Sequence, residues 1–199
     1  MHLLLVRHGQ TRFNAEHRYL GALDPELNAM GILQATALRA VLPDNLDAVV
    51  CSPLRRARQT ADTICQDSGL LPSVNTAFRE RHVGVFEGLT QMEAQTRFPD
   101  LWGQNVTRQW HAAPTGGETI AEVVERVTAG LRGLSEQHRG KTVALVAHGF
   151  VAKVIRAVAQ AGFDDFFEWQ LANGAVHAIS LPATDAAWLA KALPPLPQA

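Results

Sequence analysis

The N-terminal stretch limits what this chain of 199 residues can fold into more than any other part of it. Four apolar residues, 3–6, are followed at once by Arg7, His8 and Gly9. A short apolar run that ends at a breaker predicts a buried strand, and in open α/β sheets ligands bind beyond the carboxyl ends of the strands. We therefore expect Arg7 and His8 at the functional end of a central strand. Gly9 should let the backbone turn sharply and let a ligand come close.

Composition and charge favour one ordinary globular domain over residues 1–199. Hydrophobic residues make up 47% of the chain and the formal net charge is -1, so we expect a packed core. A near-neutral chain is not suited to general binding of nucleic acid or of an anionic membrane, which requires a basic surface. No apolar run is as long as a membrane span, and the N-terminus has no signal-peptide pattern. These features predict a cytoplasmic protein without nucleic-acid or membrane partners.

Strand and helix patterns alternate along the chain. Further strands are expected at residues 46–51, 72–76, 142–147 and 174–181, and helices over 29–41, from about 53, from about 120 and over 151–161. This alternation predicts an α/β fold, a three-layer α/β/α sandwich with a mostly parallel central sheet. Residues 12–24 read as a loop. Residues 81–115, rich in bulky side chains, read as an inserted cap with one or two short helices, and the proline-rich tail 193–199 as extended or disordered.

Capping residues and cysteines add local expectations. Asn28 should cap the first long helix, and Thr119 with Glu122 has the spacing of a capping box. Ser52 should cap the helix that follows the second strand, with a proline at its first position. Cys51 and Cys65 do not form a CxxC pair and should be buried as small hydrophobic residues.

Charged and imidazole side chains should meet at one end of this sheet. Arg56 lies between two other arginines in the first turns of a predicted helix, where cations are unfavourable unless an anion is bound; a solvated basic helix face is the alternative. The groups expected to converge are Arg7, His8, Arg56, Glu80 and His148. Arginine binds phosphate oxygens in two-point fashion, so this set is suited to phosphoryl transfer without a metal. No HExxH motif or His/Cys cluster predicts a metal site.

Five motifs follow one another over residues 2–181. They are Arg7-His8-Gly9-Gln10-Thr11 with Asn14; Ser52-Pro53-Leu54 with Arg56-Ala57 and Thr60-Ala61; Glu80 with Gly84 and Glu87-Gly88; Gly117-Glu118-Thr119; and His148-Gly149. In this order they resemble the signatures of the histidine phosphatase superfamily, which is phosphoglycerate mutase-like. One such motif would be weak evidence, but five in order cover nearly the whole chain.

The resemblance implies a role for each matched residue and needs no cofactor. His8 would attack phosphorus and form a phosphohistidine, while Glu80 would protonate the leaving oxygen and then take a proton from the attacking water. The phosphate pocket would be completed by Arg7, Arg56 and His148, with neutral donors from Asn14 and the backbone at Gly21. Neighbouring arginines should lower the pKa of His8 and keep it neutral. A bound phosphate dianion should favour the acid form of Glu80, so activity should be highest at mildly acidic pH.

Within the superfamily the sequence favours hydrolysis of a small-molecule phosphomonoester. The stretch 116–119 resembles the phosphatase branch, which includes α-ribazole phosphatase and broad phosphomonoesterases. Arg81 resembles a mutase residue that binds substrate, yet the consecutive arginine pair of mutases is replaced by the separated Arg97 and Arg108. A cofactor-dependent phosphoglycerate mutase and a non-catalytic phosphate-binding module are the alternatives. The substrate, expected to depend on residues 81–115, and the oligomeric state, a homodimer included, stay open.

Overall fold

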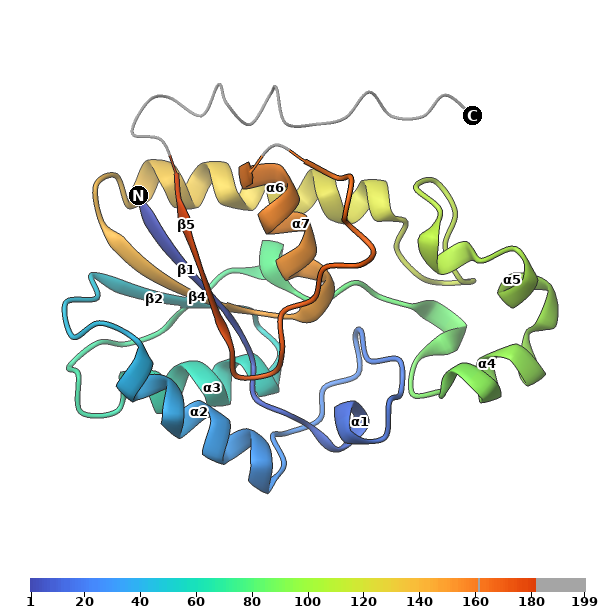
Figure 1. Ribbon diagram of the computed structural model, residues 1–199, viewed down its shortest axis with the longest axis horizontal. Helices are drawn as coiled ribbons and strands as arrows, with labels where there is room; N and C mark the ends of the chain where they lie inside the picture. Colours follow the sequence, from blue (N-terminus) through green and yellow to red (C-terminus); the bar gives the residue numbers. More distant parts are fainter. Residues whose placement is uncertain (161, 182–199) are drawn as a thin grey trace.

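A five-stranded mixed sheet lies at the centre of the protein (Figure 1). The computed structural model describes residues 1–160 and 162–181. The strands are β1 (His2–Arg7), β2 (Ala48–Cys51), β3 (Ser73–Val74), β4 (Thr142–Ala147) and β5 (Val176–Ser180), in the order β3-β2-β4-β1-β5. β1, β2, β3 and β4 are mutually parallel, and β5 runs antiparallel along the free edge of β1. The predicted α/β fold with a mostly parallel sheet is confirmed.

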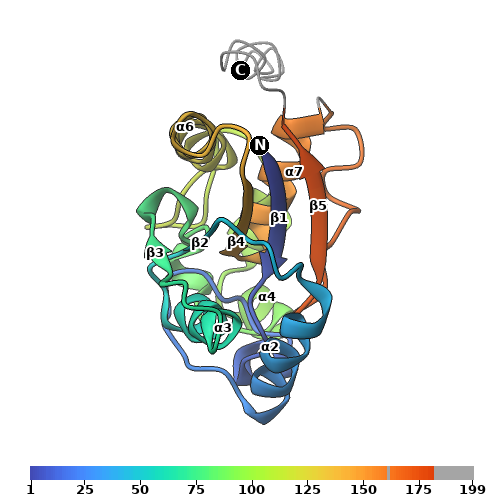
Figure 2. The same cartoon turned by 90° about the vertical axis from the view of Figure 1, so that its left-hand side faces the viewer.

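Helices cover both faces of the sheet (Figures 1 and 2). The helices on one face are α2 (Ala29–Val41) and α3 (Arg55–Cys65), and those on the other are α6 (Ile120–Gln137) and α7 (Gly149–Gln160). The predicted three-layer sandwich is therefore present. No helix within residues 1–160 and 162–181 is long and apolar enough to cross a membrane.

The central strand β4 shows how the sequence builds two cores at once. Val143, Leu145 and Ala147 face α6 and α7, whereas Ala144 and Val146 face α2 and α3. All five side chains are completely buried. A strand covered on both faces needs a continuous apolar run because successive side chains point to opposite faces. This explains why residues 142–147 could be recognised from the sequence with the bounds that the structure shows.

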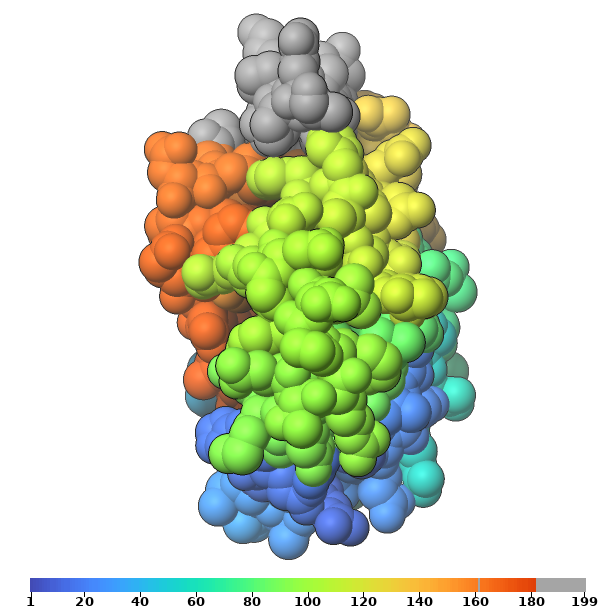
Figure 3. Space-filling model, turned by 90° about the vertical axis from the view of Figure 1, so that its right-hand side faces the viewer, coloured from blue at the N-terminus to red at the C-terminus, as the bar shows by residue number. Residues whose placement is uncertain are grey.

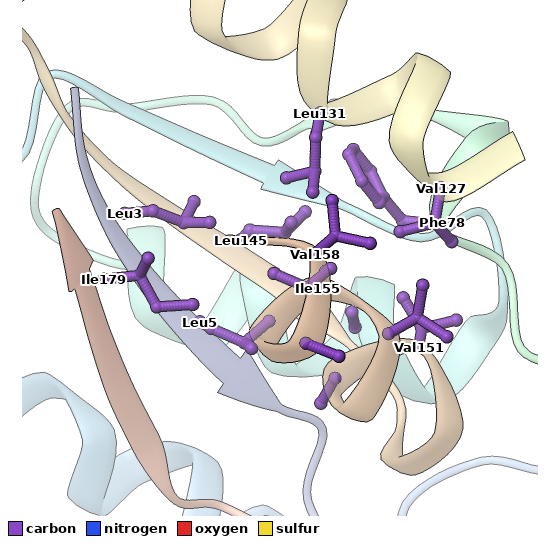
Figure 4. Packing of buried hydrophobic residues seen from close by; sticks show 14 of the residues in the cluster. Leu3, Leu5, Phe78, Val127, Leu131, Leu145, Val151, Ile155, Val158 and Ile179 are labelled. Carbon is purple, nitrogen blue, oxygen red and sulfur yellow. The ribbon is translucent and has the colours of Figure 1, made fainter. Parts of the chain in front are cut away.

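The larger core joins the sheet to α6 and α7 (Figure 4). Leu3, Leu5 and Leu145 from the strands pack with Leu131 of α6 and Ile155 of α7, and none of these side chains is exposed. Burial of each such side chain contributes roughly 1.5–3 kcal/mol. The contacts fix α7 against β1 and β4, and α7 begins at the end of the sheet where the charged motifs converge.

Two expected helix caps are present and one is displaced. Thr119 forms the predicted capping box at the start of α6, and Asn28 caps α2. Ser52 does not cap α3, which begins at Arg55 after Leu54. The physical reason is that the Ser52 hydroxyl is engaged elsewhere, 2.6 Å from a ring nitrogen of His148.

Other local expectations were wrong in detail. Residues 12–24, expected as a loop, contain the short helix α1 (Arg12–Ala15). Its capping box pairs Thr11 with Asn14, whereas the usual capping box has Glu or Gln at the second position. The helix start was therefore not recognised in the sequence. α7 begins at Gly149, earlier than expected, and β3 has only two residues. Both cysteines are buried, as expected, and the tail 193–199 lies outside the described residues.

The expected cap region contains the helices α4 (Gln91–Arg97) and α5 (Pro99–Gly103) and the short 3-10 helix η3 (Val106–Arg108). They lie together at one end of the molecule, on the right in Figure 1 and in front in Figure 3. This segment has a small core of its own, formed by Phe86, Leu89, Ala94 and Val106. The bulky residues of the segment therefore serve mainly as local core.

Gly9 is needed for packing more than for a special turn. A Cβ atom at Gly9 would lie 2.3 Å from the carbonyl oxygen of Gly31 in α2, a distance that real Cβ contacts essentially never show. The loop after β1 thus lies directly on the backbone of α2. The backbone N–H of Gly9 donates to Thr60 Oγ1 of α3 at 3.1 Å, so both helices of this layer hold the residue next to His8.

Candidate active site

His8 and His148 lie side by side because they follow neighbouring parallel strands. Arg7 of β1 is in register with Ala147 of β4, so the next residue of each chain segment leaves the sheet at the same level. The two imidazole rings are 5.0 Å apart between centroids and meet edge to face. Both rings are buried, with 2% and 0% of their surface exposed. The sheet therefore brings together the two histidines that the sequence placed at strand ends.

Hydrogen bonding fixes which nitrogen of His8 is available for chemistry. Nδ1 lies 2.7 Å from the carbonyl oxygen of Gly9, which can only accept, so Nδ1 carries the proton and donates. The lone pair is then on Nε2, which receives the Nε–H of Arg56 at 3.3 Å. Burial, and next the positive charges of Arg56 and Arg7, hold the pKa of His8 well below 6.5. His8 is therefore a neutral imidazole whose unprotonated nitrogen, Nε2, can act as a nucleophile once a ligand takes over the N–H of Arg56.

Arg56 is completely buried in the first turn of α3. Its Nη1 donates to the carbonyl oxygen of Leu23 at 2.7 Å and its Nη2 to that of Gly21 at 2.9 Å. Burial lowers the pKa of Arg56 to about 10, so the group remains a cation at neutral pH. The N–H of Gly21 already donates to Glu87 Oε2 at 3.0 Å. Gly21 thus positions Arg56 through its carbonyl group, in contrast to the expected role of its N–H as a phosphate donor.

Two more donors near His8 are buried without a partner in the described part of the chain: Nε of Arg7 and Nδ1 of His148. Arg7 Nη1 donates to the carbonyl oxygen of Leu171 at 2.7 Å, and His148 Nε2 pairs with the Ser52 hydroxyl at 2.6 Å. Burial, and next the charge of Arg56, hold the pKa of His148 well below 6.5, so its ring is neutral. Buried donors without acceptors are costly, and an anion bound beside them would supply the acceptors.

Glu80 is held at the N-terminus of α7. Its Oε2 accepts the N–H of Phe150 at 3.1 Å, and its Oε1 accepts the N–H of Val151 at 3.3 Å and of Arg81 at 2.9 Å. The N–H groups of a first helical turn have no partner within the helix, so the carboxylate satisfies them and is oriented by them. Only 9% of Glu80 is exposed.

Some of the predicted site residues line one cavity of about 250 Å³, whereas Arg56, His148 and Gly21 are not part of its lining. Its lining includes Arg7, His8, Asn14 and Glu80, which the sequence predicted, and also Lys153 and Gln170, which it did not. Asn14 Oδ1 is used within the cap of α1, which leaves its amide NH₂ to face a ligand. The described lining comes from residues 7–20, 80 and 149–171 and contains none from 81–115. We expected residues 81–115 to cover the site, but none of them forms the wall of the cavity next to His8.

Arg81 does not line this cavity either. Its Nε donates to the carbonyl oxygen of Glu118 at 2.8 Å and its Nη1 to that of Thr107 at 2.7 Å. The guanidinium lies over the ring of Phe150 at 5.0 Å, and 2% of the residue is exposed. Burial lowers the pKa of Arg81 to about 10. Arg81 thus ties the cap segment to the core, a role that its sequence position did not reveal.

The model of the histidine phosphatase superfamily (branch 1) matches residues 3–191. The chain belongs to this superfamily. A phosphoglycerate mutase-like protein of Arabidopsis thaliana is 34% identical over 155 residues, which cover 76% of this chain and 67% of that protein. A glucosyl-3-phosphoglycerate phosphatase of Mycolicibacterium vanbaalenii is 34% identical over 166 residues, 78% of this chain and 72% of that one. The chain spans 43% of the length of a related bifunctional protein of Mycobacterium tuberculosis.

The structure agrees with this membership. The α-ribazole phosphatase of Shigella flexneri superposes with a TM-score of 0.81 at 28% sequence identity, covering 92% of this chain and 91% of that one. The histidine phosphatase fold therefore extends over nearly all of the described residues. Among those residues, no group of three or more His, Cys, Asp or Glu side chains is arranged to hold a metal ion.

Glu87 of the third motif holds the loop beside Arg56 in place, a specific role that we did not expect from its sequence position. Its carboxylate accepts the N–H of Gly21 at 3.0 Å, of Ala22 at 2.7 Å and of Val83 at 3.1 Å. It thereby fixes the loop whose carbonyl groups bind Arg56. A Cβ atom at Gly21 would lie 2.1 Å from the carbonyl oxygen of Arg81, so this position must be glycine for the loop to come so close.

Arg126 of α6 binds the backbone of the segment that carries Glu80. Its guanidinium donates to the carbonyl oxygens of Arg79 at 2.8 Å and Glu80 at 3.3 Å, and pairs with Glu118 at 2.9 Å. Glu118 also accepts the N–H of His82 at 2.9 Å. Although burial opposes it, hydrogen bonding lowers the pKa of Glu118 to about 2, so the ion pair persists at any pH at which the enzyme would work. Glu118, part of the fourth motif, is thus a structural anchor for the segment that carries Glu80.

We expect Glu87→Gln to lower the free energy of unfolding by about 1.5–3 kcal/mol, because it replaces hydrogen bonds to a charged acceptor by weaker neutral ones. The measurement is urea unfolding followed by circular dichroism. Glu136→Gln, which removes the same charge from an exposed position of α6, is the matched control and should change stability by less than about 0.5 kcal/mol. Equal effects of the two variants would show that Glu87 does not brace the loop.

We also expect the free energy of unfolding to decrease as the pH is lowered below about 6.5, the pKa of histidine in an unfolded chain. The folded protein keeps His148 neutral because its pKa is lowered. Below pH 6.5 the unfolded state therefore binds a proton that the folded state does not, and the free energy of unfolding decreases. His148→Gln removes this contribution, so its loss of stability between pH 7.5 and 5.5 should be about 1 kcal/mol smaller than that of the wild type. Urea unfolding at both pH values tests this, with exposed His111→Gln as control; identical pH dependence in wild type and His148→Gln would contradict it.

Proposed function

We propose that this chain is a phosphomonoester hydrolase that forms a phosphohistidine on Nε2 of His8. The observation that carries the proposal is the state of His8 itself. The ring is buried and neutral, Nδ1 is bound to the carbonyl group of Gly9, Nε2 accepts the N–H of Arg56, and His8 lines the cavity together with Arg7. Nε2 is the unprotonated nitrogen of this ring and accepts the Nε–H of Arg56, so it can attack phosphorus when substrate oxygens take over that donor.

The reaction that this geometry supports has two steps. In the first, Nε2 of His8 forms a bond to phosphorus while the bond from phosphorus to the substrate oxygen breaks, and Glu80 gives its proton to that oxygen. In the second, Glu80 takes a proton from water, whose oxygen attacks phosphorus. The N–P bond then breaks, and phosphate leaves with His8 neutral again. Arg7 and Arg56 stabilise the charge on the equatorial oxygens in both steps.

His148 and Asn14 complete the phosphate pocket. Ser52 can donate its hydroxyl proton to Nε2 of His148, which places the ring proton on Nδ1, the atom without a partner in the described residues. The Asn14 amide faces the same cavity. Both groups are neutral donors, so they bind the transferred phosphoryl group without adding a further charge to the neighbourhood of His8.

Hydrolysis is supported over the mutase reaction by the contacts of the arginines. Arg81, the residue expected to bind substrate in a mutase, donates instead to two backbone carbonyl groups. Arg108 lies over the ring of Phe167 at 4.9 Å, apart from Arg97 in α4. Similarity to proteins named as phosphatases, among them glucosyl-3-phosphoglycerate phosphatase and α-ribazole phosphatase, also supports hydrolysis. The natural substrate we propose is a small phosphomonoester.

The first test is phosphate release from p-nitrophenyl phosphate in the presence of EDTA. We expect turnover by the wild type and a decrease of at least about 10³-fold in His8→Ala, because the nucleophile is lost. His111→Ala, an exposed histidine of the cap segment, should behave as wild type. Quenching during turnover with denaturant at alkaline pH, where the acid-labile N–P bond survives, should trap phosphorylated wild type but no phosphorylated His8→Ala protein. Equal turnover by wild type and His8→Ala would refute the proposal.

A second test separates the acid from the nucleophile. We expect Glu80→Gln to reduce kcat/KM far more for an alkyl phosphate than for p-nitrophenyl phosphate, because an alkoxide needs a proton to leave and p-nitrophenolate does not. The readout is the ratio of the two kcat/KM values, which loss of folding alone would not alter. Glu136→Gln provides the control for the same change at an exposed site. An unchanged ratio would mean that Glu80 is not the general acid.

A further inference from the structure

One cation in the wall of the His8 cavity has no task in the reaction described above. Lys153 lies in α7 one helical turn beyond Gly149, and Gly149, Phe150 and Lys153 all line the cavity. Residues four apart on a helix share a face, so Lys153 extends the surface that begins with the N–H groups holding Glu80. Gln170 lines the same cavity.

The charges around this cavity are not balanced. Arg18 lines it but is paired with Glu16 at 2.7 Å and Glu93 at 2.6 Å. Lys153 has no carboxylate within 4.0 Å of its ammonium group in residues 1–160 and 162–181, since the ion pairs there do not include it. Its Nζ donates once, to the carbonyl oxygen of Phe167 at 2.9 Å. An ammonium group has three donors, so two remain for a ligand.

Lys153 is also partly removed from water. It is half-buried, and burial, followed by the positive charge of Arg108, lowers its pKa. Glu168 and Glu80 act in the opposite direction on this pKa, but neither forms an ion pair with Lys153. A partly desolvated cation without an ion-pair partner becomes more favourable when an anion binds beside it. The phosphoryl group is already matched by Arg7, Arg56 and His148, so the anion for Lys153 must be another part of the substrate.

We propose that Lys153 binds a carboxylate of the substrate, and that the preferred substrates are phosphomonoesters with a carboxylate a few bonds from the phosphate. This inference rests on the proposed hydrolase function and names its substrate class. A carboxylate fits better than a second phosphate because lysine is a compact point charge without the fork of arginine. The neighbouring side chain of Gln170 is neutral and can add a donor but no second charge.

The test compares two substrates of nearly equal shape, 3-phosphoglycerate and glycerol 3-phosphate, which differ by a carboxylate in place of a hydroxymethyl group. We expect wild type to prefer 3-phosphoglycerate in kcat/KM by about tenfold or more, the usual value of a hydrogen bond to a charged group. Lys153→Met should lower this preference about tenfold, whereas Lys153→Arg should keep most of it. Lys141→Met removes a lysine at an exposed site before β4 and should leave the preference as in wild type.

The outcomes distinguish this inference from the proposed function. If wild type releases phosphate from neither substrate nor from p-nitrophenyl phosphate, the hydrolase function fails and the inference fails with it. If both substrates are hydrolysed but wild type shows no preference, or Lys153→Met keeps it, only the carboxylate assignment is overturned. An equal decrease for both substrates in Lys153→Met would place Lys153 on the phosphoryl group and also overturn the assignment. Lys153→Gln gives a second neutral variant should Lys153→Met fold poorly.

Discussion

The site depends on keeping one completely buried cation, Arg56, beside a neutral imidazole. Burial of an ion costs several kcal/mol unless hydrogen bonds replace its hydration. Arg56 obtains these bonds from the carbonyl groups of Gly21 and Leu23, and that loop keeps its shape because Glu87 accepts its N–H groups. Residues from three motifs far apart in the sequence therefore depend on one another's contacts. Each of them would be unfavourable alone, which explains why they occur together.

The same cations determine which ligands are favourable beside His8. Arg7 and Arg56 hold His8 neutral, and Arg7 Nε and His148 Nδ1 lack partners among the described residues. A phosphoryl dianion would supply acceptors to both donors and counter-charge to both arginines. Sites arranged for such a ligand reduce the stability of the protein without it. The buried aliphatic core that the sheet forms with α6 and α7 contributes stability that offsets this loss.

The sequence allowed the frame of the site to be predicted but not its inner contacts. β4 was found with its bounds because a strand buried on both faces has a continuous apolar run. His8 and His148 were placed together because parallel strands end at the same edge of the sheet. Glu80 was expected among the groups at this end of the sheet, but nothing in its local pattern predicts that its carboxylate accepts the first N–H groups of α7. Ser52 was expected to cap a helix, but its hydroxyl pairs with His148, 96 residues away in the sequence. Local sequence patterns do not reveal a contact over such a separation.

The position of α7 links catalysis to recognition. Its first N–H groups orient Glu80, and its next turn carries Lys153. One helix therefore carries both the N–H groups that orient the acid and the proposed carboxylate-binding group, within about one turn of each other. A substrate that uses both must have its leaving oxygen and its carboxylate a few bonds apart. Longer molecules would reach past Lys153 towards Gln170 and the segment after α7. That segment lines the cavity next to His8 together with residues 18–20, whereas none of residues 81–115 does.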